Sequence, residues 1–270
     1  MKKINYIVLF FMFPVLSLNA QSVATPSYWD EVDFNDTSLI SSRTLTDKLV
    51  SYLYGFTDGD EHRFDSLSIA GLDTIFAKAK VNMSMYEFIL EFALDGYTAM
   101  GRSAVTDHLL NYPQLGENDI TMEEGLRLDS ITERFQKVKV GAKAPDIEFV
   151  SIDGKPYHLY GSDADRIIVF FWSTDCEYCH DFLVHLRRNL DLKSDFELVT
   201  FALAETQEEV EAAVKKMRLP GYHFYDSLRW DSKPFLDYHI TSTPTAFVLD
   251  HEKTIVCKPY DWYDLKEWLK

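Results

Sequence analysis

The spacing of apolar residues changes near residue 139 and divides the chain into two parts. Before that point apolar residues recur every three or four positions, as they do on the buried face of a helix. Four such faces are predicted: Leu45, Leu49, Tyr52, Leu53 and Phe56; Leu67, Leu72, Ile75, Phe76 and Ala79; Phe88, Ile89, Phe92 and Ala93; and Leu128, Ile131, Phe135 and Val138. Capping boxes at Ser84–Glu87 and Thr121–Glu124 predict where two of the helices begin. We therefore expect an all-helical domain over residues 21–138.

After residue 139, short apolar runs are separated by helical segments, which is typical of an α/β domain. We expect this domain to cover residues 139–270. A hairpin is predicted between residues 147–150 and 157–159, and further strands at 167–172, 196–203, 245–250 and 254–257. Helices are predicted from Cys176, from the capping box Thr206–Glu209 to about Arg218, over 231–238 and over 261–270. The order strand, helix, strand predicts a parallel pair inside a mixed sheet with helices on both faces.

Two cysteines follow the most apolar of these runs. Residues 167–171 are too few for a helix, so with Trp172 they predict a strand that is buried on both faces. After a short turn, Cys176 and Cys179 open a helical segment, and unpaired backbone N–H groups at a helix N-terminus favour a thiolate. The two cysteines lie almost one turn apart and can form a disulfide. We predict that Cys176 is the attacking nucleophile and Cys179 the resolving thiol.

Two inert alternatives compete with redox chemistry at this pair. A zinc site needs further ligands, and the only other cysteine is Cys257, with no paired histidine near it. A static disulfide remains open, although a bridge that closes so short a loop adds little stability. Cys257 lies in an apolar run and is expected to be a buried small hydrophobic residue.

Two motifs together resemble the thioredoxin superfamily. Phe171-Trp172 before the cysteine pair matches its active-site strand and turn, and Ser242-Thr243-Pro244-Thr245 resembles its cis-proline loop. The resemblance implies a thioredoxin-like fold after the all-helical domain. It also implies that Pro244 is cis and lies beside the disulfide, that the Thr243 backbone pairs with an extended substrate, and that Trp172 belongs to the substrate site.

The start of the α/β domain resembles one subfamily of the thioredoxin superfamily in particular. Gly-x-x-Ala-Pro-Asp over residues 141–146, followed by the predicted hairpin, is similar to the opening of exported TlpA- and ResA-like proteins. The resemblance implies a thiol-disulfide oxidoreductase that acts on protein disulfides and is recycled by an upstream redox partner. No cofactor is expected besides the redox-active Cys176–Cys179 disulfide.

Several residues depart from thioredoxin. Asp175 precedes the first cysteine, and Glu177 and Tyr178 stand between the pair. Both carboxylates disfavour a thiolate at Cys176, and a destabilised thiolate makes a stronger reductant, so we expect a reductant whose potential these three residues tune. Phe170 stands where thioredoxin has a buried acid, and Glu205 is a guess for the base that replaces it.

Three other functions compete with this one. A peroxidase would need threonine and proline where Ser173 and Val169 stand. Copper delivery could use His180 and His239, but copper-passing members of the superfamily usually space their cysteines one residue further apart. A non-catalytic binding or scaffold protein, in which the helical domain acts and the cysteine pair only stabilises, stays open.

The helical domain itself shows no nucleophile–base pair, phosphate loop or metal-spaced histidine cluster. It resembles helical regions that precede thioredoxin-like domains in some exported bacterial proteins. We expect an accessory role, such as positioning a partner, covering the redox site or forming a dimer. The formal charge of −16 disfavours binding to nucleic acid.

The first twenty residues have the layout of a secretory signal peptide. Lys2-Lys3 precede an apolar stretch from Ile7 to Leu16, and Leu18-Asn19-Ala20 offers a cleavage position before Gln21. The stretch is shorter than the ~20 residues that a spanning helix needs. We therefore expect a soluble protein in the periplasm or an equivalent compartment, with no membrane span after cleavage and a formal charge of −18.

Export gives a direct test. The protein purified from an exporting bacterial host is expected to begin at Gln21, because signal peptidase cleaves after the small residue Ala20. Intact-mass spectrometry measures the start of the chain. A purified protein that begins at Met1 would contradict the prediction.

Overall fold

The computed structural model describes residues 26–40, 42–53, 55, 61–112, 114–116, 119–190, 196–259 and 261–268. The predicted signal peptide, residues 1–20, lies outside them, as does Phe56 of the first predicted helical face. Contacts divide the chain into two compact units, the first formed by residues up to Thr98 with Arg102–Glu133, and the second by Ala99–Gly101 with Arg134–Lys270. Each unit is described separately below.

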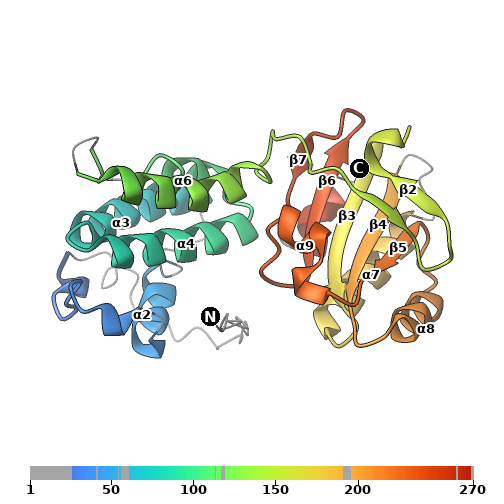
Figure 1. Ribbon diagram of the computed structural model, residues 1–270, viewed down its shortest axis with the longest axis horizontal. Coiled ribbons are helices and arrows are strands. Elements are labelled where there is room, and N and C mark those ends of the chain that lie inside the picture. Colours follow the sequence, from blue (N-terminus) through green and yellow to red (C-terminus); the bar gives the residue numbers. More distant parts are fainter. Residues whose placement is uncertain are drawn as a thin grey trace. The chain divides into compact units, whose positions relative to one another are not determined.

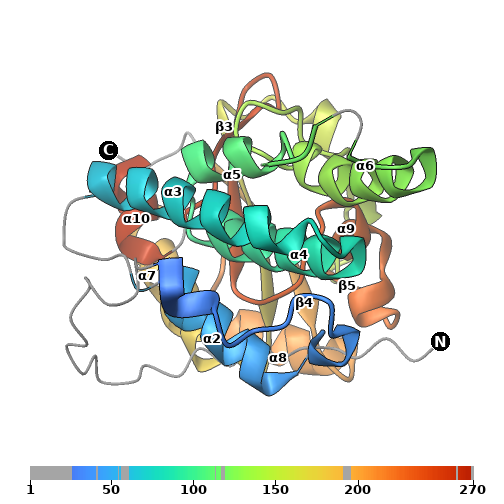
Figure 2. The ribbon, with the colours of Figure 1, turned by 90° about the vertical axis from the view of Figure 1, so that its left-hand side faces the viewer.

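The first unit is helical, as the spacing of apolar residues predicts (Figures 1 and 2). Its elements are η1 (Pro26–Trp29), η2 (Thr37–Leu39), α2 (Arg43–Leu53), α3 (Glu61–Ala79), α4 (Met83–Ala99), α5 (Ser103–Leu109) and α6 (Met122–Gln136), whose last turn lies in the second unit. Most residues of the four predicted faces are buried, whereas Leu67, Phe88 and Phe92 are half-buried. The buried set confirms that these are core positions, although Phe135 and Val138 belong to the second unit, whose core cluster includes Val138.

One of the two predicted capping boxes in this unit is present. Thr121 and Glu124 bond reciprocally, with the Thr121 N–H donating to the Glu124 carboxylate at 2.7 Å and the Glu124 N–H to the Thr121 hydroxyl at 3.3 Å. The box predicted at Ser84 is wrong, because α4 begins one residue earlier and the Asn82 side chain accepts from the Ser84 N–H at 3.1 Å. Glu87 pairs instead with Arg127 of α6.

The second unit is built on a five-stranded mixed sheet with the order β5-β4-β3-β6-β7 (Figure 1). Its strands are β3 (Arg166–Ser173), β4 (Phe196–Leu203), β5 (Tyr222–Tyr225), β6 (Thr245–Asp250) and β7 (Ile255–Cys257), after a hairpin of β1 (Glu148–Val150) and β2 (Pro156–His158). Its other helices are η3 (Leu159–Gly161), α7 (Glu177–Leu190), α8 (Gln207–Met217), η4 (Arg229–Asp231), α9 (Lys233–Asp237) and α10 (Trp262–Trp268). β3 is parallel to β4 and antiparallel to β6. The predicted mixed sheet is therefore confirmed.

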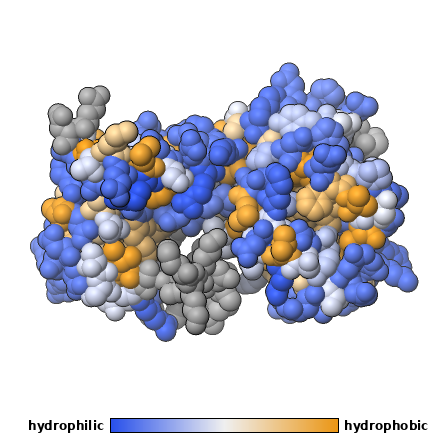
Figure 3. All heavy atoms as spheres, in the orientation of Figure 1, coloured by the Kyte–Doolittle hydropathy of each residue, from blue (hydrophilic) through white to orange (hydrophobic). Residues whose placement is uncertain are grey.

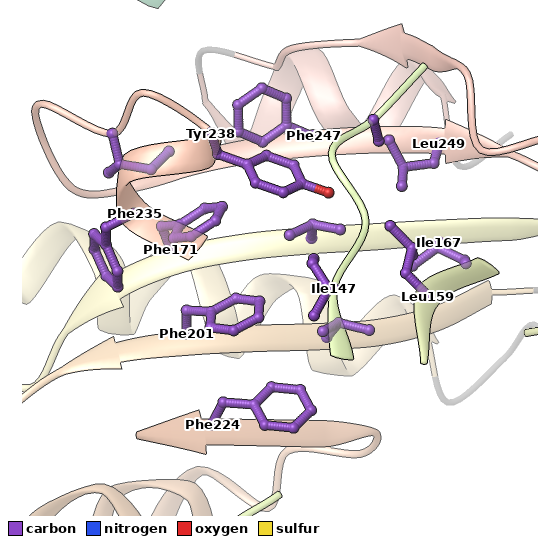
Figure 4. Packing of buried hydrophobic residues seen from close by; sticks show 14 of the residues in the cluster. Ile147, Leu159, Ile167, Phe171, Phe201, Phe224, Phe235, Tyr238, Phe247 and Leu249 are labelled. Carbon is purple, nitrogen blue, oxygen red and sulfur yellow. The ribbon is translucent and has the colours of Figure 1, made fainter. Parts of the chain in front are cut away.

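The central strand β3 is buried on both faces, as its continuous apolar run predicts. Ile167, Val169 and Phe171 point into one core cluster, which the hairpin and α9 complete with Ile147, Tyr157 and Phe235. Figure 4 shows this cluster, with Phe171 and Phe201 on adjacent strands and Phe235 beside them. Ile168, Phe170 and Trp172 enter the opposite cluster, which contains Phe182, Leu183 and Leu186 of α7. Packing in these two clusters fixes the position of the end of β3 relative to α7.

The sequence reasoning missed strand β5, which pairs in parallel with β4. The strand has only four residues and follows Leu219-Pro220-Gly221, a sequence that ends helices and gave no strand pattern. Gly221 has φ +97°, and a Cβ there would lie 2.0 Å from the carbonyl oxygen of Leu198 on β4. The turn into β5 therefore needs a residue without a side chain.

The surface of the molecule is largely hydrophilic on the face that Figure 3 shows, with scattered hydrophobic residues. Large exposed apolar side chains include Met122, Leu126, Tyr178, Leu228 and Tyr263. In the described part of the chain, no helix has both the length and the apolar character needed to cross a membrane.

Gly221 and Gly154 form a matched pair for testing the β5 turn. Both have positive φ, +97° and +81°, but a Cβ at Gly154 meets nothing within 4 Å. Gly154→Ala should cost ~1–2 kcal/mol of unfolding free energy for backbone strain alone. Gly221→Ala should cost ~3 kcal/mol or more, because the clash with β4 adds to that strain. Chemical denaturation followed by tryptophan fluorescence measures both, and equal losses would show that the close approach is unimportant.

Candidate redox site

The cysteine pair stands where β3 ends and α7 begins. The turn between them is tied to the neighbouring strand, because the Thr174 N–H donates to the Leu203 carbonyl at 3.0 Å. The Cys176 N–H donates to the Ser173 carbonyl at 3.2 Å, and α7 starts at the next residue, Glu177. The predicted strand, turn and helix N-terminus are all present.

Cys176 and Cys179 form a disulfide, and their Cα atoms lie 5.2 Å apart. The Cys179 N–H, in the first turn of α7, donates to the Cys176 sulfur at 3.1 Å. Cys176 is half-buried and Cys179 is fully buried. Cys176 is thus the sulfur that another molecule can reach, and the helix amide that points at it would stabilise negative charge there.

The proline loop lies against the same sulfur. β6 runs antiparallel to β3 with Thr245 opposite Phe171, so the start of β6 meets the end of β3. The Thr243 carbonyl oxygen is 3.9 Å from the Cys176 sulfur, and the Thr243–Pro244 peptide is cis. Thr243 and Pro244 are half-buried, so both retain exposed surface beside the disulfide. The fold brings together two motifs that are far apart in the sequence.

Residues 164–255 match a family model described as thioredoxin-like. The second unit has a thioredoxin-like fold. The matched range contains the disulfide, the proline loop and strands β3 to β6.

Comparison with solved structures agrees on the fold. A crystal structure of a thioredoxin-like protein from Bacteroides caccae is similar over 96% of this chain and 96% of that chain, with a TM-score of 0.59 and 19% identity. A thiol-disulfide oxidoreductase from Bacteroides fragilis is similar over 48% of this chain and 97% of that chain, with a TM-score of 0.43 and 20% identity. No curated protein matches the chain. At 19% identity the first of these similarities shows the fold alone, and it extends over both units.

Trp172 lies inside the thioredoxin-like domain rather than at its surface. Its side chain has no exposed area and packs in the cluster that contains Cys179 and touches Cys176. Direct contact with a substrate, which the sequence predicts for Trp172, therefore does not fit this structure. The alternation of side chains along β3 explains the difference, because it directs Trp172 to the face that α7 covers.

The residues expected to tune the potential are exposed around Cys176. Asp175 and Glu177 are exposed, and 68% of Tyr178 is accessible. Water and salt screen exposed charges, so the two carboxylates oppose a thiolate less strongly than buried ones would. Their tuning role stays a prediction.

A phenylalanine packs at the position where thioredoxin has a buried acid. Phe170 is fully buried, and its ring lies 4.9 Å from that of Phe182 on α7. Glu205, the guessed base, is exposed, and its carboxylate pairs with Arg229 at 2.5 Å. No hydrogen bond among the described residues joins Glu205 to either cysteine. The pair with Arg229 gives Glu205 a structural role at the end of β4.

His180 lies beside Trp172, a position that the sequence did not predict, since the sequence suggested His180 only as a candidate copper ligand. Its ring lies 6.0 Å from that of Trp172, and its Nε2 atom is buried without a hydrogen-bond partner among the described residues. Its position four residues after Cys176 was the available signal, because side chains four apart are neighbours on a helix. His239, the other copper candidate, packs its ring against Phe135 at 4.4 Å. Within the described part of the chain, no three His, Cys, Asp or Glu side chains gather as a metal site would require.

Cys257 is a free thiol on β7, buried in the cluster beneath α7. Burial, together with the nearby Asp264 carboxylate, raises the pKa of the Cys257 thiol to about 12. A thiol with so high a pKa stays protonated at neutral pH and is a poor nucleophile. Cys257 therefore fits the expected role of a buried small hydrophobic residue.

The raised pKa of Cys257 predicts that it resists alkylation in the folded protein. At pH 8, four units below a pKa of about 12, only about one thiol in ten thousand is ionised. Iodoacetamide should leave the oxidised native protein unlabelled and should label Cys257 after unfolding in guanidinium chloride. Peptide mass spectrometry reads the label. Rapid labelling of the native oxidised protein would show that Cys257 is accessible and acidic.

Proposed function

We propose that this protein is an exported thiol-disulfide oxidoreductase that reduces disulfides in other proteins. The observation that carries the proposal is the environment of Cys176. Its half-buried side chain accepts a hydrogen bond on sulfur from a helix N–H at 3.1 Å, while its partner Cys179 is fully buried. That arrangement leaves one reactive sulfur and protects the other, which is what a cycle of attack and resolution requires.

The cycle balances with two cysteines and no further cofactor. In the reduced protein, the Cys176 thiolate attacks one sulfur of a substrate disulfide, and the other substrate sulfur leaves as a thiolate. Cys179 then loses its proton and attacks Cys176 in the mixed disulfide, so that the second substrate thiolate leaves and the Cys176–Cys179 disulfide returns. The substrate gains two electrons, and an upstream dithiol partner restores the reduced pair.

The proline loop supports a role in binding the substrate chain. The Thr243 carbonyl lies 3.9 Å from the Cys176 sulfur, so a backbone that approaches this sulfur also meets Thr243. An extended substrate segment can pair with exposed backbone groups of this kind, as peptides do when they add to a sheet edge. We assign the contact to Thr243 and Pro244, with Trp172 beneath the disulfide as support.

The remaining parts of the proposal rest on the sequence. The signal peptide that the sequence predicts over residues 1–20 supports export to a periplasm-like compartment, and the carboxylates of Asp175 and Glu177 support a reducing potential. The helical unit, which has a hydrophobic core of its own, is assigned an accessory role as a platform for partners or for a dimer.

Serine variants of the three cysteines test the proposed activity. Wild type should accelerate the reduction of insulin by dithiothreitol, and Cys176→Ser and Cys179→Ser should fall to the uncatalysed rate, because each lacks one half of the cycle. Cys257→Ser is the matched control and should keep at least about half of the activity, since Cys257 is a buried free thiol on β7 that takes no part in the proposed cycle. Insulin turbidity measures the rate.

The resolving variant gives a second readout. Cys179→Ser should still attack substrates and should accumulate a mixed disulfide on Cys176, which non-reducing mass spectrometry detects. A wild-type protein without activity and without a mixed disulfide in this variant would favour the non-catalytic scaffold, in which the bridge only stabilises the fold.

A further inference from the structure

His180 lies on the same face of α7 as Cys176. The His180 N–H donates to the Cys176 carbonyl at 3.1 Å, which places the two residues one turn apart in a regular helix. Side chains four residues apart are neighbours, with Cβ atoms about 5–6 Å from each other. The His180 side chain therefore starts one helical turn from Cys176, whose sulfur the proposed cycle uses first.

Two nitrogen atoms beside the disulfide lack partners. The rings of His180 and Trp172 meet edge to face at 6.0 Å, and both the His180 Nε2 and the Trp172 Nε1 are buried without a hydrogen bond among the described residues. Trp172 packs in the cluster that contains Cys179 and touches Cys176, and the His180 ring lies against the Trp172 ring. A buried polar atom without a partner costs free energy, which a suitable acceptor would recover. The neutral disulfide is a weak acceptor, whereas a thiolate is a strong one.

We propose that His180 stabilises the Cys176 thiolate of the reduced protein by donating from its Nε2 atom, an inference that rests on the proposed function. When a donor dithiol reduces the disulfide, the donor becomes a disulfide and the Cys176–Cys179 bond breaks. Cys179 takes one proton and becomes a thiol, Cys176 remains a thiolate, and the second proton goes to solvent or to the imidazole. The new thiolate then accepts from His180.

Besides His180, the Cys179 N–H favours a thiolate, since it donates to the Cys176 sulfur at 3.1 Å, and the remaining groups that face Cys176 oppose a thiolate or are uncharged. On its own turn these are the carboxylates of Asp175 and Glu177, which disfavour a thiolate. From the proline loop the Thr243 carbonyl oxygen approaches at 3.9 Å, and from β3 the uncharged Trp172 indole packs below. His180 offsets the carboxylates and raises the reactivity of Cys176 at neutral pH.

The same helix contains a matched control. His185 also packs on a tryptophan, since its ring is stacked on that of Trp262 at 5.6 Å. It is exposed, and it is five residues further along α7 than His180. Replacing His185 removes a histidine–tryptophan contact from the same helix without changing the surroundings of the disulfide.

Three variants of the full chain test the inference: His180→Ala, His180→Gln and His185→Ala. Two quantities are measured on the purified protein, the equilibrium with reduced and oxidised glutathione and the pH dependence of Cys176 alkylation by iodoacetamide. His180→Ala should raise the pKa of Cys176 by about one unit and shift the equilibrium about tenfold toward the disulfide, which corresponds to ~30 mV more reducing. The sign follows because the lost contact exists only in the reduced form.

The other two variants make the test specific. His180→Gln keeps an N–H donor and should show a smaller shift than His180→Ala, and His185→Ala should match wild type. Thermal unfolding of the oxidised proteins checks that all of them fold. The inference would be overturned if both His180 variants kept the wild-type glutathione equilibrium and Cys176 pKa, or if His185→Ala shifted them equally. The proposed function would still stand in that case, provided that the wild type reduces insulin. A wild type that neither equilibrates with glutathione nor reduces insulin would overturn the proposed function itself.

Discussion

The antiparallel pairing of β3 with β6 is the constraint on which the redox site depends. β3 delivers the cysteine pair at its carboxyl end, and the register that sets Thr245 opposite Phe171 brings the amino end of β6 to the same place. The proline loop reaches the Cys176 sulfur because of this register. A slip of one residue would turn every side chain of β6 to the other face and move the loop away from the sulfur. The buried clusters on both faces of β3 fix the register.

Burial divides the chemistry between the three cysteines. Cys176 is half-buried at a helix N-terminus, where a backbone amide donates to its sulfur. Cys179 lies one turn behind it and is fully covered, and Cys257 lies on strand β7 in the same cluster, where burial raises its pKa. The same side chain therefore has three different environments within one domain. Backbone position, more than the nature of the neighbouring side chains, separates the reactive sulfur from the protected ones.

Local signals predicted much of the fold. The apolar run of β3 exceeds what a surface strand would contain, so its burial on both faces followed from composition alone. The Thr121–Glu124 box specified a helix start because it needs only residues within one turn. Ser84 failed as a cap because α4 begins before it, and the preceding residue Asn82 caps the helix by accepting from the N–H groups of Ser84 and Met85. β5 was missed because its short segment becomes a strand only through pairing with β4.

The sequence by itself determined the strand, the turn, the helix and the two cysteines at its start, because residues within about fifteen positions specify all of them. It also indicated the proline motif around Pro244, but by itself it did not show that the Thr243 carbonyl lies against the Cys176 sulfur. Tertiary structure alone decided that Trp172 is buried, that Glu205 pairs with Arg229 and that His180 stands beside Trp172 with its Nε2 enclosed. These outcomes depend on which face of a strand or helix is covered by a distant part of the chain. Burial of that kind is a property of the packed sheet and its helices, and no local pattern contains it.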